Sequence, residues 1–552
     1  ISSRFAPKPR VLMSAQPPAP TSSADSPITT GGVDSRAPSG SEPAGSQEAA
    51  GLNAAATDTG FAARVRSALA WRWGSQVAMQ IITWTSTILV VRLLEPTDYG
   101  LFAMSQVVLT ALAFLNGQSF ATSLVQTSHV DERRIGQIFG LLLLFNGTLG
   151  LCQFLFAPYA AAYFGEPLVA DMLRVQALIF LTVPFSALPS ELLARRLEFR
   201  KQAQVTMVTA IVGAVVALVL AWRGFGVWAL VYAPIAMFAT RAIGLSIAAR
   251  LLVKPIFDPR GAWDLVTFGG TLTICQLFWI IQSQSDIVIA GRLLPTYDLG
   301  LYSEALFLTL IVTGRFLPPI NEVALAAYSE LHREGKPLGT YFVKTARMVM
   351  TVTAPIYVGI ALTAEAAVLT LFGEKWAGSI PIVGGLALVM PALALHLICS
   401  PVTNAMGRPR VFLFTSACGA IIMPAAFLIG VSGTGGSAGG AAMGLVHAWW
   451  VAAPLLCAIT LSATLPRIGV GPLTLLRELA PVALACAAMA LAVLGVQRFA
   501  VIGAPALDLA WNAFVGACVY AGAFWLVWPH IVKDAWRMLR PRAQAPKAPE
   551  PA

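Results

Sequence analysis

Charged side chains are scarce in this chain, and their scarcity excludes an ordinary soluble protein. Of the 552 residues, 12% are charged and 57% are hydrophobic, with a mean hydropathy of +0.72. Soluble domains carry roughly 25% charged residues. Between residues 70 and 528, apolar windows of the ~20 residues that cross a bilayer recur with only short polar breaks. The pattern predicts an all-α polytopic membrane protein, because lipid cannot satisfy exposed backbone groups and the alternation of a β-barrel is missing.

Metal-binding and catalytic motifs are missing as well. The seven cysteines include no CxxC pair, the five histidines include no HExxH, and no GxxxxGK[ST] sequence occurs. These absences argue against a zinc site, a disulfide framework and a built-in ATPase. We therefore predict no cofactor, no metal and no catalytic residue.

The net charge of +10 does not indicate a nucleic-acid partner, because the basic residues gather in alternate connections between apolar segments. Connections with an even number carry most of the Lys and Arg, as the positive-inside rule requires of cytoplasmic loops. The composition predicts an inner-type membrane protein, and the alternation predicts that its two termini both lie in the cytoplasm.

The apolar segments predict about fourteen spans, arranged as two six-helix bundles in parallel repeat followed by two extra helices. The tails are polar, and the first is rich in Ser, Pro, Ala and Gly. We predict a disordered cytoplasmic tail over 1–62, bundles over 63–250 and 251–465, two additional helices over 466–530, and a basic cytoplasmic tail over 531–552.

One hairpin sequence occurs twice, at 92–102 and 292–302. Arg, Leu, Leu, Asp, Gly and Leu recur at positions whose numbers differ by 200. Each copy joins two apolar segments on the predicted outer side, so the repeat predicts two halves related by an axis along the membrane normal. We expect the glycines to permit tight turns and the aspartates to cap the following helices, in a structural role. These residues are Asp98, Gly100, Asp298 and Gly300.

Polar residues inside the spans are the candidates for a substrate cavity, because polarity is costly in lipid. Each has a structural alternative: Gln side chains also tie helices together, Asp286 could cap a helix or pair with Arg292, and Arg315 could pair with Glu322. The candidates from the spans are Gln76, Gln80, Gln284, Asp286 and Arg315. The pair Glu95 and Asp98 could also imitate a glycosyltransferase site, but such enzymes need a large outer loop.

Three segments resemble bacterial polysaccharide-repeat flippases, a group within the multidrug/oligosaccharidyl-lipid/polysaccharide exporter superfamily. They are the first hairpin at 75–102, the basic loop at 192–201 and the mid-chain segment at 281–305. The resemblance covers about 66–465 and implies two six-helix bundles that form a V, opening alternately to each side by ion-coupled rocking. It also implies Arg292 and Arg315 as cavity cations and Asp286 as the family's acidic position, with Glu304 and Glu322 as departures nearby.

The implied substrate is an undecaprenyl-diphosphate-linked oligosaccharide, moved from the inner to the outer leaflet for lipopolysaccharide, capsule or exopolysaccharide synthesis. The implied partners are a polysaccharide polymerase and a chain-length regulator. Two alternatives remain. A cation-coupled multidrug exporter would have the same fold, although an arginine-bearing cavity counts against it. A polytopic polymerase or ligase would need a long outward loop.

Overall fold

The computed structural model describes residues 79–116, 132–196, 198–250, 253–257, 262–433, 440–499 and 503–527. Side chains are described throughout these ranges except at 262–276, 409 and 527. Every regular element in them is a helix, which confirms the all-α prediction. Both predicted tails, and Gln76, lie outside the described residues.

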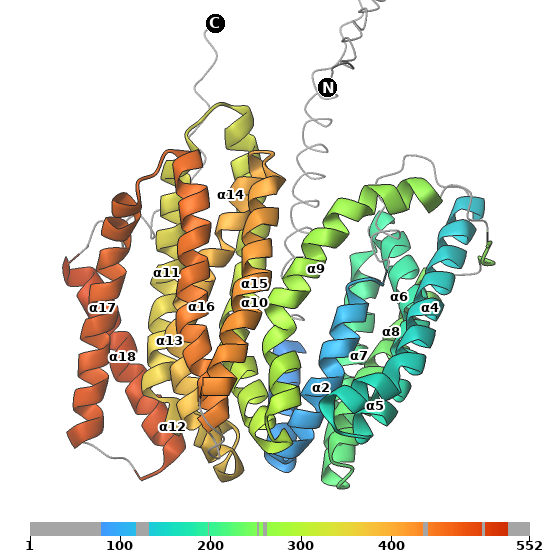
Figure 1. The fold of residues 1–552 in the computed structure, drawn as a ribbon, viewed down its shortest axis with the longest axis horizontal. Coiled ribbons are helices and arrows are strands. Elements are labelled where there is room, and N and C mark those ends of the chain that lie inside the picture. The colour runs from blue at the N-terminus through green and yellow to red at the C-terminus, as the bar shows by residue number, and fades with distance from the viewer. Residues whose placement is uncertain are drawn as a thin grey trace, which may run out of the picture. The chain divides into compact units, whose positions relative to one another are not determined.

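The first half is a bundle in which α8 packs against α7 and α6, and α6 packs against α4 (Figure 1). Its fourth apolar segment is broken at Ala177 into a short and a long helix. The helices are an unlabelled one at Met79–Leu93, α2 Pro96–Ala113, α4 Glu132–Phe164, α5 Leu168–Gln176, α6 Leu178–Arg195, α7 Phe199–Trp222 and α8 Val227–Ala249.

The second half is a bundle in which α15 packs against α9 and α16, and α13 packs against α11 and α16. Short 3-10 turns follow α12 and α16. The elements are α9 Ala262–Leu293, α10 Thr296–Arg333, α11 Leu338–Leu362, α12 Ala364–Leu371, η1 Glu374–Ser379, α13 Ile380–Leu397, α14 Cys399–Ala405, α15 Pro409–Gly433, α16 Gly440–Thr464 and η2 Leu465–Ile468.

Two further helices, α17 Pro472–Phe499 and α18 Pro505–Val527, pack against each other and against the second half. The Tyr520 hydroxyl donates to the Thr351 carbonyl at 2.9 Å, and Arg347 pairs with Glu478 at 2.8 Å. The pair is therefore joined to α11 by polar as well as apolar contacts.

Eleven helices in the described residues are long and apolar enough to cross a membrane. Large apolar side chains on several of them are exposed, among them Phe156 (62%), Trp222 (75%) and Leu491 (73%), as expected where the surrounding solvent is lipid. The first, second and seventh predicted spans, which correspond to Met79–Leu93, α2 and α9, are not among these eleven helices, so the count of about fourteen stays a prediction.

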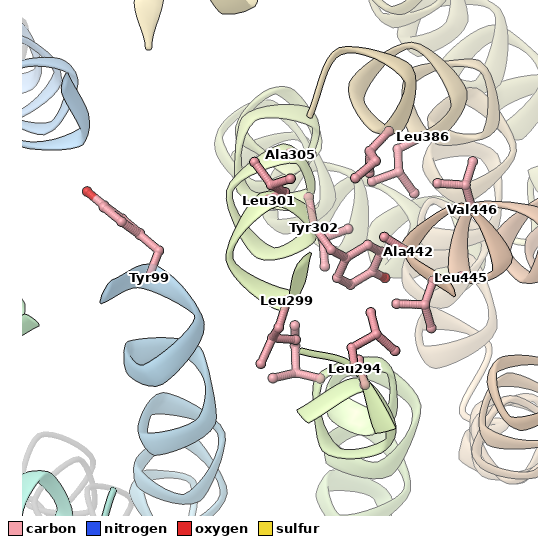
Figure 2. Close-up of a cluster of buried hydrophobic side chains, with 14 of the residues drawn as sticks. Tyr99, Leu294, Leu299, Leu301, Tyr302, Ala305, Leu386, Ala442, Leu445 and Val446 are labelled. Atoms are coloured by element: carbon pink, nitrogen blue, oxygen red, sulfur yellow. The ribbon is translucent and has the colours of Figure 1, made fainter. Parts of the chain in front are cut away.

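The two halves share a buried core where α2 contacts α9 and α10. Val91 and Leu94 of the first half belong to the same buried cluster as Leu299 and Tyr302 of the second. Figure 2 shows Tyr302 directed toward α16, beside Leu445. This core lies at the end of the bundles that carries both hairpins, which we call the hairpin end.

Candidate functional site

The two repeated glycines lie against the backbone of the opposite hairpin. A Cβ atom at Gly100 would lie 2.0 Å from the Thr296 carbonyl oxygen, and one at Gly300 would lie 1.8 Å from that of Pro96. Both glycines are inside helices and neither has positive φ. The predicted tight turns are therefore wrong: the missing side chain allows α2 and α10 to approach each other reciprocally.

The repeated aspartates differ in what they do. The Asp98 carboxylate accepts a hydrogen bond from the Glu95 N–H at 3.1 Å, at the start of α2. At the start of α10 the position of Glu95 is taken by Pro295, which has no N–H to donate, and no side chain caps this helix. The predicted cap at Asp298 is therefore absent, because Pro295 offers no backbone N–H for the Asp298 carboxylate to accept from.

The repeated arginines bind opposite halves. Arg92 donates from Nε to the Leu371 carbonyl at 3.1 Å and from a terminal nitrogen to the Thr370 carbonyl. Arg292 donates to the Tyr163 carbonyl at 2.8 Å. Each guanidinium thus satisfies carbonyls at the C-terminal end of a helix in the other half, where a cation is electrostatically favoured. Arg292, predicted as a cavity cation, instead joins the halves at the hairpin end.

The carbonyls that accept from these arginines lie directly before a second repeat, which our sequence reasoning missed. Phe-Gly-Glu occurs at 164–166 and again at 372–374. Gly165 and Gly373 both have positive φ, 78° and 94°, which glycine adopts readily after the last turn of a helix. The accepting carbonyls of Tyr163 and Leu371 immediately precede this motif, and a search for short repeats would have found it.

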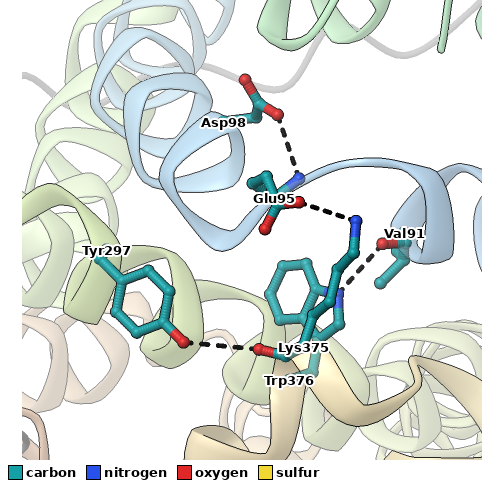
Figure 3. Close-up of polar contacts among 6 residues, drawn as sticks. All are labelled: Val91, Glu95, Asp98, Tyr297, Lys375 and Trp376. Atoms are coloured by element: carbon teal, nitrogen blue, oxygen red, sulfur yellow. Dashed lines mark hydrogen bonds and ion pairs between the residues drawn. The ribbon is translucent and has the colours of Figure 1, made fainter. Parts of the chain in front are cut away.

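Further contacts close the hairpin end around α12 and η1 (Figure 3). Lys375 pairs with Glu95 at 2.7 Å, and the buried Trp376 donates from its indole nitrogen to the Val91 carbonyl at 3.1 Å. The Tyr99 and Trp376 rings meet edge to face with centroids 5.3 Å apart. Tyr99 also lines the cavity described below, so this aromatic pair connects the hairpin end with the wall of that cavity.

A cavity of about 480 Å³ lies between the two halves. Its first-half wall includes Thr83, Ser86 and Thr87, which share one face of the Met79–Leu93 helix at helical spacing. Its second-half wall comes from α9 and the first turns of α10. The polar side chains lining it, apart from Tyr99, are Thr83, Ser86, Thr87, Gln106, Gln284, Ser303 and Glu304.

Glu304 is the only carboxyl group in the described lining, and that lining contains no Lys, Arg or His. The Glu304 side chain is 4% exposed, and its Oε1 atom is buried without a hydrogen-bond partner. An unpaired buried carboxyl oxygen is costly. Our sequence analysis noted Glu304 only as a departure from the family, because periodicity does not show which half a side chain faces.

Gln284 and Asp286 occupy different environments although they are two residues apart. Gln284 lines the cavity, and its contact with a substrate stays a prediction. Asp286 is 2% exposed and does not line it. The Asp286 carboxylate accepts from the Tyr302 hydroxyl at 2.9 Å, which in turn accepts from the Trp449 indole at 2.8 Å. Asp286 therefore joins α9, α10 and α16 inside the second half.

The remaining candidates do not line the cavity. Gln80 is partly buried, on the helix that carries Thr83, and its amide nitrogen has no partner. Arg315 is exposed on α10, eleven residues beyond Glu304, and forms no ion pair with Glu322 among the described contacts. Its place on α10 puts it about three helical turns farther from the hairpin end than Glu304. No group of His, Cys, Asp and Glu among the described residues could hold a metal.

Comparison with known families decides the class of the protein. A family model described as "Polysaccharide biosynthesis protein" matches residues 89–381, more than half of the chain. The chain belongs to this family. The match begins within the Met79–Leu93 helix and ends in α13, so it includes both hairpins, both Phe-Gly-Glu motifs and the α10 wall of the cavity.

Relatives of the chain include one protein named as a transport protein and others named for the biosynthesis of surface polymers. The succinoglycan biosynthesis transport protein ExoT of Rhizobium meliloti is 26% identical over 374 residues, 68% of this chain and 76% of that protein. The lipopolysaccharide biosynthesis protein WzxC of Escherichia coli is 21% identical over 309 residues, covering 54% and 61%. The teichuronic acid biosynthesis protein TuaB of Bacillus subtilis is 21% identical over 272 residues, covering 49% and 56%. The matches thus span less than two thirds of the last two proteins.

Two solved structures have the same fold. The lipid II flippase MurJ in an inward closed conformation gives a TM-score of 0.64 at 12% identity, covering 84% of this chain and 99% of that one. An inward-facing MATE multidrug resistance transporter gives a TM-score of 0.56 at 14% identity, covering 71% and 94%. The chain therefore has the transporter fold predicted from the sequence.

Proposed function

We propose that the protein is a flippase that moves undecaprenyl-diphosphate-linked oligosaccharide repeat units from the inner to the outer leaflet of the bacterial inner membrane. The observation that carries the proposal is the cavity between the two halves, closed at the hairpin end by reciprocal contacts. Such a cavity gives a polar headgroup a path across the bilayer while its lipid tail stays in the hydrocarbon. Membership in the polysaccharide biosynthesis family supports this substrate class.

The distribution of basic residues supports an assignment of the hairpin end to the outer face and of both termini to the cytoplasm. In this orientation the described conformation is closed on the outside. Transport then requires the Arg92 and Arg292 contacts to break as the halves rock about the cavity, and we propose that an ion gradient drives the motion. We propose that the two bundles, 63–250 and 251–465, move relative to each other. The two helices within 466–530 then move together with the second bundle. A polymerase and a chain-length regulator are the proposed partners.

An exporter of amphiphilic cations is a second candidate, because one observation favours it. Neither Arg292 nor Arg315 lines the cavity, so the sequence-based argument against a cationic substrate does not hold. A mainly apolar cavity with one carboxyl group in its described lining is suited to an organic cation. Family membership favours the polysaccharide substrate over this one.

Deletion of the gene, with complementation by the wild-type chain, tests the proposal. We expect the surface glycan to disappear and the lipid-linked unit to accumulate on the cytoplasmic leaflet, where an impermeant lectin reaches it in inverted vesicles but not in spheroplasts. Complementation should restore both. Unchanged glycan together with greater sensitivity to amphiphilic cations would overturn the proposal in favour of the second candidate.

A further inference from the structure

We infer that residues 253–257 form a strap that stays bound to α4 and limits how far the two halves separate at the end opposite the hairpins. This extended segment belongs to the connection between α8, the last helix of the first half, and α9, the first helix of the second. It lies across two glycines of α4, Gly136 and Gly140. The inference rests on the proposed function, because it sets a limit to the motion of the halves that transport requires.

The two glycines form the seat of the strap. They are four residues apart, so they lie one above the other on the same face of α4. A Cβ atom at Gly136 would lie 2.8 Å from the Lys254 carbonyl oxygen, and one at Gly140 would lie 2.3 Å from the Ile256 carbonyl oxygen. Both contacts are with backbone, so no side-chain rotamer would relieve them. The missing side chains therefore allow the strap to approach the helix backbone.

Hydrogen bonds fix this part of the chain to the first half at two points. The Ile256 N–H donates to the Gly136 carbonyl at 2.8 Å. A carbonyl has two lone pairs, so Gly136 can accept this bond together with the one inside its own helix. Before the strap, Arg196 at the C-terminal end of α6 donates to the carbonyl of Ala249, the last residue of α8, at 3.1 Å. The strap is therefore preceded and held by contacts within one half.

The bound strap shortens the covalent tether between the halves. Ala262, the first residue of α9, follows Ile256 by six positions and Arg250 by twelve. A chain spans at most about 3.5 Å per residue, so the start of α9 stays within about 20 Å of Ile256, whereas a released strap would let it reach about 40 Å from Arg250. Because α9 packs against α15 of the second half, a limit on the start of α9 also limits that half.

The two ends of the first half are thus held in different ways. At the hairpin end, Arg92 and Arg292 bind across the halves with exposed side chains, which can exchange these bonds for water. The strap binds through its backbone inside one half, so separation of the halves breaks none of its described contacts. It therefore stays in place through the transport cycle and acts as the stop for opening on the proposed cytoplasmic side.

Gly140→Ala in the purified full chain tests the inference, because the added methyl group displaces the Ile256 carbonyl. Alanine has a higher helix propensity than glycine, so α4 itself is not weakened. Hydrogen exchange measures protection of the Ile256 N–H. Spin labels at the exposed positions Arg200→Cys on α7 and Arg333→Cys on α10, in a chain whose native cysteines are alanine, measure the separation of the halves by double electron–electron resonance.

We expect Gly140→Ala to exchange the Ile256 N–H about fivefold faster or more, because the bond to Gly136 is lost. The distance distribution between the labels should gain a population at least about 5 Å longer than any in the wild type, because the tether is longer. Gly147→Ala is the matched control, because a Cβ atom there meets open space on the same helix. It should change neither measurement.

A second variant lengthens the tether and leaves the strap intact. Insertion of Gly-Ser-Gly-Ser after Phe257 adds about 14 Å of reach, so it should lengthen the label distance while the Ile256 N–H stays protected as in the wild type. Unchanged exchange or distance in Gly140→Ala, or unchanged distance in the insertion variant, would overturn the inference. If both variants respond as expected but the wild-type chain moves no labelled undecaprenyl-diphosphate trisaccharide in proteoliposomes, the strap is supported and the proposed function is overturned.

Discussion

Gly300 lies so close to Pro96 that a Cβ atom at position 300 would be 1.8 Å from the Pro96 carbonyl oxygen. Gly100 has the same relationship to Thr296, at 2.0 Å. Position 296 is the counterpart of position 96, and position 300 is the counterpart of position 100. The duplicated hairpins thus meet as a pseudo-symmetric pair, and this pairing closes one end of the cavity.

Gly300→Ala should destabilise this closure. The added methyl group meets backbone, which no change of rotamer relieves, and overpacking of this kind costs about 1–3 kcal/mol or more. Thermal unfolding of the purified protein should show a lower Tm, and glycan export in complemented cells should fall. Gly314→Ala is the matched control, because the same helix has open space there. Alanine should leave stability unchanged or raise it by up to about 1 kcal/mol.

Arg92→Gln and Arg292→Gln should each favour opening at the hairpin end. The arginines are exposed, so each set of charge-assisted hydrogen bonds contributes about 1 kcal/mol to the closed state, or roughly a fivefold shift in the equilibrium. The measurement is the labelling rate of Thr87→Cys by an impermeant thiol reagent added to intact cells. The chain without the added cysteine provides the background.

Because the two arginines each bind the opposite half, both variants should label faster than the wild-type arginine background, and the double variant should label faster than either. Arg223→Gln, which removes an exposed arginine with no described contact to the other half, should leave labelling unchanged. Unchanged labelling in either Arg92→Gln or Arg292→Gln would contradict a closure that both arginines stabilise.

Tyr302→Phe should lower stability by about 1–3 kcal/mol, because it leaves the Asp286 Oδ2 atom and the Trp449 indole N–H without a buried partner. The side chain keeps its shape, so packing is not changed. Denaturation midpoints should reveal the loss. Tyr297→Phe on the same helix removes only an exposed, 3.4 Å contact with the Lys375 carbonyl and should shift stability by no more than about 0.5 kcal/mol. Equal effects at the two positions would contradict a structural role for the Asp286 network.

The Glu95–Lys375 pair should contribute weakly and in a salt-dependent way. Both side chains are about half exposed, at 59% and 48%, and exposed pairs are worth about 0.2–1 kcal/mol. A double-mutant cycle with Glu95→Gln and Lys375→Gln should give a coupling energy in this range in dilute buffer. The coupling should vanish near 1 M salt, where the Debye length is about 3 Å. A coupling that is unaffected by salt would contradict an exposed ion pair.

Local chemistry was a poor guide to the roles of individual residues. Gly100 and Gly300 stood out by repetition, yet a preference for glycine is the same whether a turn or a close contact with another helix requires it. Arg292 and Asp286 stood out by charge, yet Arg292 binds the end of a helix and Asp286 accepts a hydrogen bond from Tyr302. Glu304 was passed over as a candidate because its neighbours in the cavity come from helices distant in the sequence.

The sequence by itself determined the class of the protein: an all-α membrane protein with duplicated hairpins and the features of a polysaccharide exporter. Hydropathy, charge placement and repetition are properties of the linear sequence, so they can be recognised without the tertiary structure. Only the tertiary structure decided which repeated residues meet, which arginine binds which half, and that the described cavity wall carries a carboxyl group and no cation. Those facts depend on how helices from different halves face one another, which no local pattern encodes.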